Sequence, residues 1–194
     1  MAAKLLIATT NPSKLREIRP LLQGVELVSL ADIDPIPEPE ESGATFWENA
    51  RIKALAYAAG SGLTAVAEDS GLVVDAMDGA PGVLSARFMG ASTPYPERFT
   101  EIFRRLDGRD RTARFVTALA VASGRTIVFE TETAVEGEIA REPAGAHGFG
   151  YDPIFVYPPF ACTTAQLPDR DKAAVSHRAR AFRDLRKWLA SPTS

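Results

Sequence analysis

The stretch Leu5-Leu6-Ile7-Ala8-Thr9-Thr10-Asn11-Pro12-Ser13-Lys14 contains the transition from which the fold can be worked out. Its first four residues form a short, continuous apolar run, which is typical of a buried strand. Asn11 is a favourable helix N-cap and Pro12 suits the first helical position, so a helix is expected directly after the strand. Apolar residues then recur at helical spacing until Gly24. The stretch therefore predicts a strand–turn–helix unit.

Further strand and helix patterns follow along the chain. Thr45 and Glu48 have capping-box spacing at the start of a second helix. A strand from Thr64 is expected to end in the turn Glu68-Asp69-Ser70-Gly71, and strand character resumes at Leu72. The remaining predicted elements are a strand (25–30), a helix from about Thr93, two long hairpin strands (114–122 and 126–139), a short strand (154–156) and a last amphipathic helix (175–189). This mixture predicts an α/β fold with a mixed sheet, and residues 1–194 are expected to form one domain.

The composition narrows the class of protein. With 194 residues, 45% of them hydrophobic and 24% charged, the chain can build a substantial core. The longest apolar runs are too short for a membrane span or for a signal-peptide core, so we expect neither membrane association nor export. The single cysteine, Cys162, fits the reducing cytoplasm. A net charge of −3 does not favour nucleic-acid binding, so an anionic ligand must be held by local cationic groups.

Thr9 to Lys14 is the first candidate for such binding. It joins a buried strand to a helix N-terminus, where backbone N–H groups and the helix dipole favour an anion. Threonine hydroxyls, the Asn11 amide and the Lys14 ammonium can add donors. The segment lacks the P-loop pattern, and taken alone it is more often a purely structural junction.

Acidic residues form the second candidate. Glu68 and Asp69 are adjacent at a predicted strand end, and like charges there repel each other unless a cation lies near them. Magnesium prefers oxygen ligands, and a carboxylate beside the metal can position or deprotonate a water. The alternative is a capping turn. Glu41 lies in a loop before the second helix, where Glu38 and Glu40 also allow a simple solvated acidic loop.

The third candidate joins a glycine-rich loop to the last helix. Glycines on both sides of Phe149 let its ring approach a ligand, and an aromatic face suits a nucleobase. A glycine turn with buried aromatic side chains is the alternative. Ser176-His177-Arg178 lies outside the apolar stripe of the last helix, and Lys172 adds a cation nearby. An exposed basic helix face also explains this run.

Taken together, these segments resemble one family, the Ham1/RdgB-like inosine triphosphate pyrophosphatases, from Leu6 to Arg180. The matching blocks are ATTNPSK (8–14), ESGATFWENARIKA (41–54), EDSGLVVDAMDGAPGVLSARF (68–88), EPAGAHGFGYDPIF (142–155) and DKAAVSHRARA (171–181). Five blocks in the family order are very specific.

The resemblance implies an elongated α/β fold, with two lobes around a long mixed sheet, a nucleotide-binding cleft between the lobes, and a homodimer. It implies Mg²⁺-dependent hydrolysis of non-standard purine nucleoside triphosphates (ITP, dITP, XTP) to the monophosphate and pyrophosphate. Asp69 resembles the catalytic carboxylate, and Glu41, Glu68 and Asp69 resemble the metal ligands. The implied substrate-binding residues are Thr9, Thr10, Asn11, Pro12, Ser13, Lys14, Lys53, Ser70, Phe149, Gly150, Tyr151, Asp152, Lys172, His177 and Arg178, and Arg87 is similar to a family arginine near the site.

One position departs from the bacterial pattern. Many bacterial members carry two aspartates where this chain has Glu68-Asp69, which resembles the glutamate–aspartate pair of eukaryotic members. Which of the two carboxylates carries most of the metal coordination stays open, and Glu40 competes with Glu41. Two rival functions also stay open, a Maf-type pyrophosphatase for modified pyrimidines and a non-catalytic nucleotide-binding protein.

Overall fold

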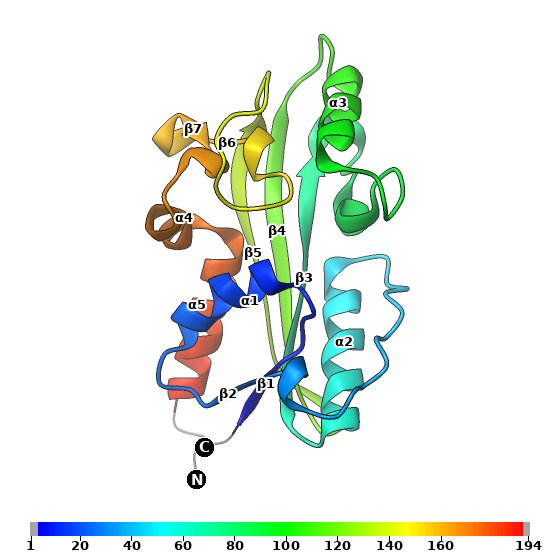
Figure 1. Cartoon of the computed structure of the whole chain (residues 1–194), viewed down its shortest axis with the longest axis vertical. Helices are drawn as coiled ribbons and strands as arrows, with labels where there is room; N and C mark the ends of the chain where they lie inside the picture. Colours follow the sequence, from blue (N-terminus) through cyan, green and yellow to red (C-terminus); the bar gives the residue numbers. More distant parts are fainter. Residues whose placement is uncertain (1–3, 192–194) are drawn as a thin grey trace. The chain divides into compact units, whose positions relative to one another are not determined.

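The computed structural model describes residues 4–191 and has an α/β fold with a seven-stranded mixed sheet (Figure 1). β1 pairs in parallel with β2 and β3, whereas β6 pairs antiparallel with β5 and β7. The strand order is β2-β1-β3-β4-β5-β6-β7, with β1 (Leu5–Ile7), β2 (Leu27–Ser29), β3 (Thr64–Val74), β4 (Thr112–Ser123), β5 (Thr126–Ile139), β6 (Phe155–Tyr157) and β7 (Cys162–Thr163). The α-helices are α1 (Pro12–Ile18), α2 (Phe46–Ser61), α3 (Tyr95–Arg105), α4 (Asp169–Val175) and α5 (His177–Ala190). The predicted fold class is confirmed.

Local signals placed most of these elements. Asn11 caps α1 by accepting hydrogen bonds from Ser13 N (2.9 Å) and Lys14 N (3.3 Å). Thr45 and Glu48 form the predicted capping box of α2. β4 and β5 are neighbours in the sheet and are joined by a two-residue turn, so the predicted hairpin is confirmed. No helix within residues 4–191 is long and apolar enough to cross a bilayer.

Two predicted boundaries were wrong. β3 runs without a break through Glu68-Asp69-Ser70-Gly71, where we expected a turn. Gly71 serves close packing instead of chain reversal, because a Cβ there would lie 2.5 Å from the carbonyl oxygen of Gly82. The last helix begins at His177 instead of Val175, since Ser176 has an extended backbone (ψ 149°) that separates α5 from the short helix α4, which the sequence did not predict.

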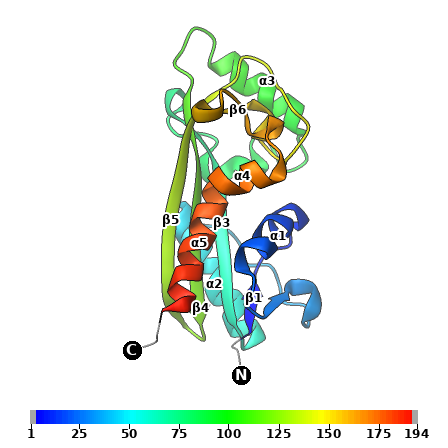
Figure 2. The same ribbon diagram turned by 90° about the vertical axis from the view of Figure 1, so that its left-hand side faces the viewer.

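The chain divides into two compact units. Unit 1 contains the described residues up to Asp69, Thr117–Thr133 and the chain from Arg178 onward. In this unit α1 and α5 cover one face of the sheet and α2 covers the other (Figures 1 and 2). The core on the first face consists of strand, α1 and α5 side chains, namely Leu5, Ile7, Ile18, Leu22, Val66, Leu119, Val121, Ala181, Phe182 and Leu185. On α2 the buried apolar residues include Ala50, Ala54 and Tyr57.

Unit 2 contains Ser70–Val116 and Ala134–His177 and has its own apolar core. The core gathers α3, strand and loop side chains, including Leu72, Phe99, Ile102, Phe115, Ile139, Tyr151 and Phe155. Arg98 is buried and donates hydrogen bonds to the carbonyl oxygens of Ser85, Ala86, Gly90 and Thr93 at 2.9–3.1 Å. Tyr151 donates its hydroxyl to the same Ser85 carbonyl at 2.9 Å. These donors hold the 82–93 segment against α3.

The buried phenol of Tyr151 generates a pH prediction. Burial raises its pKa to about 12. Because the folded-state pKa lies above the unfolded value, the stability contribution of Tyr151 is complete below about pH 10 and is lost as pH rises toward about 12. Tyr151→Phe loses the hydrogen bond to Ser85 and should be less stable than wild type at about pH 8, by about 1 kcal/mol. Urea unfolding from about pH 8 to about pH 12 should show the stability difference between wild type and Tyr151→Phe narrowing above about pH 10. A constant gap would contradict the burial argument.

Candidate functional site

Unit 1 contains a cluster of buried acidic and basic side chains, called here the carboxylate cluster. Glu68 and Asp69 are 4% and 6% exposed, so their charges need partners. The other members come from the first turn of α1, the loop before α2, α2 itself and the first turn of α5, namely Lys14, Glu41, Asn49, Lys53 and Arg178. Glu17 also belongs to it through its ion pair with Arg178 at 2.7 Å.

Glu68 and Asp69 are adjacent in an extended strand, so their side chains point to opposite faces of the sheet. Glu68 shares the face of Val66, which packs with α1 and α5. Asp69 lies on the α2 face, where it contacts Asn49 and Lys53. The two carboxylates therefore have separate sets of partners.

Glu68 is held by two cations through one oxygen. Its Oε1 lies 2.9 Å from Lys14 Nζ and 3.1 Å from Arg178 Nε. Burial alone would raise the pKa of Glu68, but Arg178 and Lys14 outweigh it and hold the pKa well below its usual range. The Glu68 pairing thus contributes stability at neutral pH and is lost only in strong acid. Within residues 4–191, its buried Oε2 has no hydrogen-bond partner.

Asp69 is held by neutral and positive donors. Asn49 Nδ2 donates to Oδ2 at 3.2 Å, and Lys53 Nζ donates to Oδ1 at 3.2 Å. Lys53 is shared with Glu41 through a second, short ion pair. Burial is the main cause that raises the pKa of Asp69. The attraction of Lys53 lowers the pKa and only partly offsets burial, and the like charge of Glu41 raises it further. Burial lowers the pKa of Lys53, but Asp69 and Glu41 outweigh it and leave the pKa raised. Asp69 is thus more basic than an ordinary aspartate.

The three expected metal ligands are not gathered into one set. Among the described residues, no group of three or more His, Cys, Asp or Glu side chains is arranged to hold a metal. Magnesium usually takes one or two carboxylates and completes its shell with water and phosphate oxygens. Glu68 Oε2, a buried carboxylate oxygen without a hydrogen-bond partner among residues 4–191, can serve as one such carboxylate ligand. The chemistry of Glu68 therefore fits a magnesium ion that takes one carboxylate from the protein and its remaining ligands from water and phosphate.

Unit 2 contains the glycine-aromatic loop, defined here as residues 145–153. The 4%-exposed Asp152 organises it, accepting from Phe149 N at 2.7 Å and from Lys172 Nζ through Oδ2. Thr164 donates to the other oxygen at 2.8 Å. The Lys172 ammonium lies 5.0 Å from the Phe149 ring centroid, within range of a cation–π interaction. The loop thus presents a half-buried aromatic ring on a rigid support.

The other expected residues have varied surroundings. The half-buried Thr9 accepts a hydrogen bond from Asn11 N (3.2 Å), and Thr10 and Pro12 are exposed. Ser13, Ser70 and Gly150 are half-buried. Tyr151 is directed into the core of unit 2, against Tyr95 and Phe99. The 7%-exposed His177 ring stacks on Phe115, with 4.9 Å between centroids.

Sequence reasoning missed Asn49, Glu17 and Thr164. Asn49 is fully buried, and its Oδ1 also accepts from Gly43 N at 2.8 Å. A weak signal was present, because Asn49 precedes Lys53 by one helical turn and so shares its face of α2. Glu17 and Thr164 become partners of Arg178 and Asp152 only through contacts between distant segments, which local patterns do not reveal.

Comparisons with known proteins agree on one group. A family model described as the Ham1 family matches residues 5–188. The chain is 46% identical to a dITP/XTP pyrophosphatase of Exiguobacterium sp. (94% of each chain covered) and 44% identical to one of Listeria monocytogenes (97% and 95% covered). Among solved structures it is similar to a HAM1 protein from Coxiella burnetii, with a TM-score of 0.89, 38% identity and coverage of 96% and 98%.

The glycine-aromatic loop depends on the absence of a side chain at Gly148. Its φ is +74°, and a Cβ would lie 2.2 Å from Asp152 Oδ2. Gly148→Ala should therefore cost more stability than the about 1–2 kcal/mol of a left-handed residue alone, because it also displaces the Asp152–Lys172 pair. Gly62→Ala is the matched control, with φ +69° and no atom within 4 Å of the added Cβ. Equal losses of unfolding free energy in Gly148→Ala and Gly62→Ala, measured by urea unfolding, would refute the close-approach argument.

Proposed function

Because this chain belongs to the Ham1 family, we propose that it is a magnesium-dependent pyrophosphatase of non-standard purine nucleoside triphosphates. The proposed substrates are ITP, dITP and XTP, and the reaction is NTP plus water to NMP plus pyrophosphate. The observation that carries the proposal is the buried Asp69, whose pKa is raised and whose carboxylate is fixed by Asn49 and Lys53. The names of the relatives support the same class of reaction. A homodimer in the cytoplasm, built from one domain over residues 1–194, belongs to the proposal as well.

In the proposed reaction Asp69 orients the attacking water and accepts its proton. Asn49 holds one orientation of the carboxylate, and the raised pKa of Asp69 increases its basicity. Lys14 and Lys53 stabilise negative charge on the phosphates, together with Lys172. A magnesium ion held by one or two of the candidate ligands Glu41, Glu68 and Asp69, with water and phosphate oxygens completing its shell, would neutralise phosphate charge and lower the pKa of a bound water.

Lys14 and Lys53 change partners in this scheme. Both ammonium groups contact carboxylates of the carboxylate cluster. A triphosphate and its cation replace these partners without leaving a buried charge uncompensated, because the added charges have opposite signs. The ion pairs thus preserve the lysines in position, close to where phosphate oxygens are needed.

Base selection is assigned to stacking on Phe149 and to edge contacts of Asp152, His177 and Arg178. Phe149 would stack on the base, held by the contacts of Asp152 to its N–H and to Lys172. Hypoxanthine and xanthine present a 6-oxo acceptor where adenine presents an amino donor. Arg178, or backbone N–H groups near Ser176 and His177, would donate to that oxygen, and adenine would leave the donor unpaired.

Two rival functions make different predictions. A Maf-type enzyme would release pyrophosphate from modified pyrimidine triphosphates, and a screen of nucleoside triphosphates separates the two substrate classes. A non-catalytic nucleotide-binding protein would bind ITP without producing IMP. Pyrophosphate release from ITP with magnesium, and its loss when EDTA removes the metal, would support the proposed function.

Asp69→Asn tests the catalytic role. The amide keeps the size of the side chain but cannot accept the proton, so kcat for ITP should fall by at least about a hundredfold while ITP binding persists. Asp75→Asn is the control, since Asp75 is exposed and pairs with Arg114 on unit 2. Near-normal turnover in Asp69→Asn would remove Asp69 from the mechanism. Steady-state kinetics and calorimetric binding of ITP make the measurement.

Base selection is tested with two variants and all four of ITP, XTP, GTP and ATP at saturating magnesium. Phe149→Ala should weaken the binding of ITP, XTP and GTP alike, by about 1–3 kcal/mol, because stacking tolerates any base. Phe160→Ala, which removes an exposed aromatic ring of unit 2, is the control. Arg178→Ala should lower kcat/KM for ITP and XTP far more than for ATP.

If Arg178→Ala lowers kcat/KM for ITP and ATP by the same factor, the role of Arg178 is instead to support Glu68. Its guanidinium already contacts Glu68 and Glu17, so its removal would then disturb the carboxylate cluster whatever the base. Backbone N–H groups near His177 would in that case read the 6-oxo group.

A further inference from the structure

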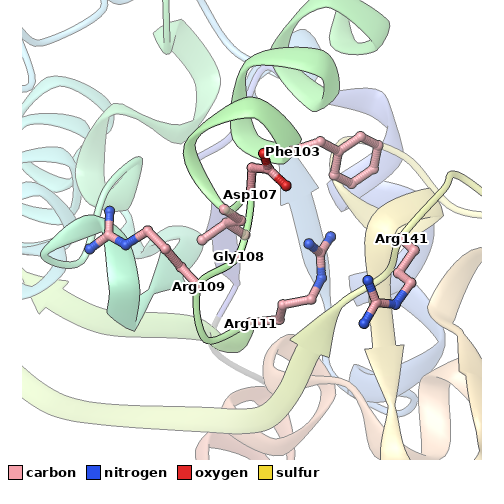
Figure 3. Close-up of a pocket in the computed structure, with 7 residues that line it drawn as sticks. Phe103, Asp107, Gly108, Arg109, Arg111 and Arg141 are labelled. Carbon is pink, nitrogen blue, oxygen red and sulfur yellow. The ribbon is translucent and has the colours of Figure 1, made fainter.

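Unit 2 carries a cavity of about 460 Å³ that shares no residue with the carboxylate cluster or the glycine-aromatic loop (Figure 3). It lies at the end of α3 and beside the ends of β4 and β5. Its lining is Phe103, Leu106, Asp107, Gly108, Arg109, Arg111 and Arg141. Three arginines against one aspartate leave two positive charges on the cavity wall. We call this cavity the arginine pocket.

Arg111 is held in place by the protein. Its guanidinium donates to the carbonyl oxygens of Ile139 (2.6 Å) and Ala140, the two residues before Arg141. It also lies over the Phe103 ring, 5.7 Å from the centroid. Ile139 N donates in turn to the Arg111 carbonyl at 2.9 Å, which ties the two strand ends together. Arg111 is therefore oriented before any ligand arrives, which lowers the entropic cost of binding.

Arg109 and Arg141 are exposed, and within the described part of the chain neither forms an ion pair with an acidic side chain. Figure 3 places Arg111 and Arg141 side by side, with Arg109 on the other side of the Gly108 turn. Burial lowers the pKa of Arg111, and the like charge of Arg141 lowers it further. The two positive charges of Arg111 and Arg141 repel each other, and a bound anion would offset this repulsion.

The geometry points to a phosphate-binding site, and we propose that the arginine pocket binds an oligophosphate chain of two or more phosphate groups. Planar guanidinium groups match phosphate oxygens with paired hydrogen bonds, which a compact ammonium cannot do. The volume lies within the range of small-molecule sites and exceeds what one phosphate ion fills. Gly108 contributes no side chain to the lining, which leaves that part of the cavity wall open to a ligand. Anion binding in the arginine pocket does not depend on whether Asp69 acts as a base.

A titration with inorganic pyrophosphate, followed at residues of the arginine pocket, tests the proposal. Inorganic pyrophosphate is titrated into the full chain in EDTA-containing buffer, and the backbone amide signals of Gly108 and Arg141 are followed by NMR. Saturable shifts at both amides are expected. In Arg109→Gln/Arg141→Gln the dissociation constant from these shifts should rise by at least about tenfold, because two charge-assisted contacts are lost.

A matched variant separates the pocket from total charge. Arg125→Gln/Lys187→Gln removes the same two positive charges from exposed positions of unit 1 and should bind pyrophosphate as wild type does. Equal weakening in both variants, or no shift at Gly108 and Arg141 of the wild type, overturns the proposal. The wild-type titration decides the question even if the pocket variant does not fold.

Two further titrations identify the source of the phosphate chain. Tripolyphosphate and ATP carry the same chain, with and without a nucleoside. Equal affinities at the pocket amides assign it to free oligophosphate, and tighter ATP binding that the pocket variant abolishes assigns it to a nucleotide. A failure of both ligands to shift these amides contradicts the proposal, whatever the result for ITP hydrolysis.

Discussion

The alternation of side chains along β3 is the constraint on which the candidate site depends. Two adjacent residues of an extended strand must face opposite sides of the sheet, and here both are buried carboxylates. Each charge would cost several kcal/mol if it were buried alone. The helices on the two faces therefore have to supply cations, with Lys14 and Arg178 for Glu68 and Lys53 for Asp69.

The two carboxylates acquire different properties from these surroundings. Glu68 receives two cations and is held ionised, whereas Asp69 shares a single lysine with Glu41 and keeps a raised pKa. A permanent anion suits metal or cation binding, and a more basic carboxylate suits proton transfer. Environment thus separates two neighbouring groups of the same chemistry into two roles, as in other sites with paired carboxylates.

The same physical rule orders unit 2 with different residues. Asp152 is buried and satisfied by Lys172, Thr164 and a loop N–H, so one carboxylate fixes the position of Phe149. Arg98 is the opposite case, because its buried guanidinium donates hydrogen bonds to backbone carbonyl oxygens and has no need of a carboxylate. The arginine pocket differs from both, since two of its three guanidiniums are exposed and have no acidic partner among residues 4–191. That contrast is why the pocket stands out as a place for an external anion.

The sequence by itself determined the elements that local chemistry dictates. The Asn11 cap, the Thr45–Glu48 capping box, the hairpin turn at Gly124 and the α/β class all followed from neighbouring residues and apolar spacing. The sequence motifs also identified Glu68, Asp69, Phe149 and Arg178 as candidates. Local signals failed at Gly71, because a glycine required for close packing has the same one-letter pattern as a glycine required for a turn. Only the tertiary structure decided which cation meets which carboxylate, that Asn49 holds Asp69, and that three arginines line one cavity. The contacts of Glu68 and Asp69 join residues 16 to 110 positions apart. Ion pairing and burial depend on distance in space, which no local pattern encodes.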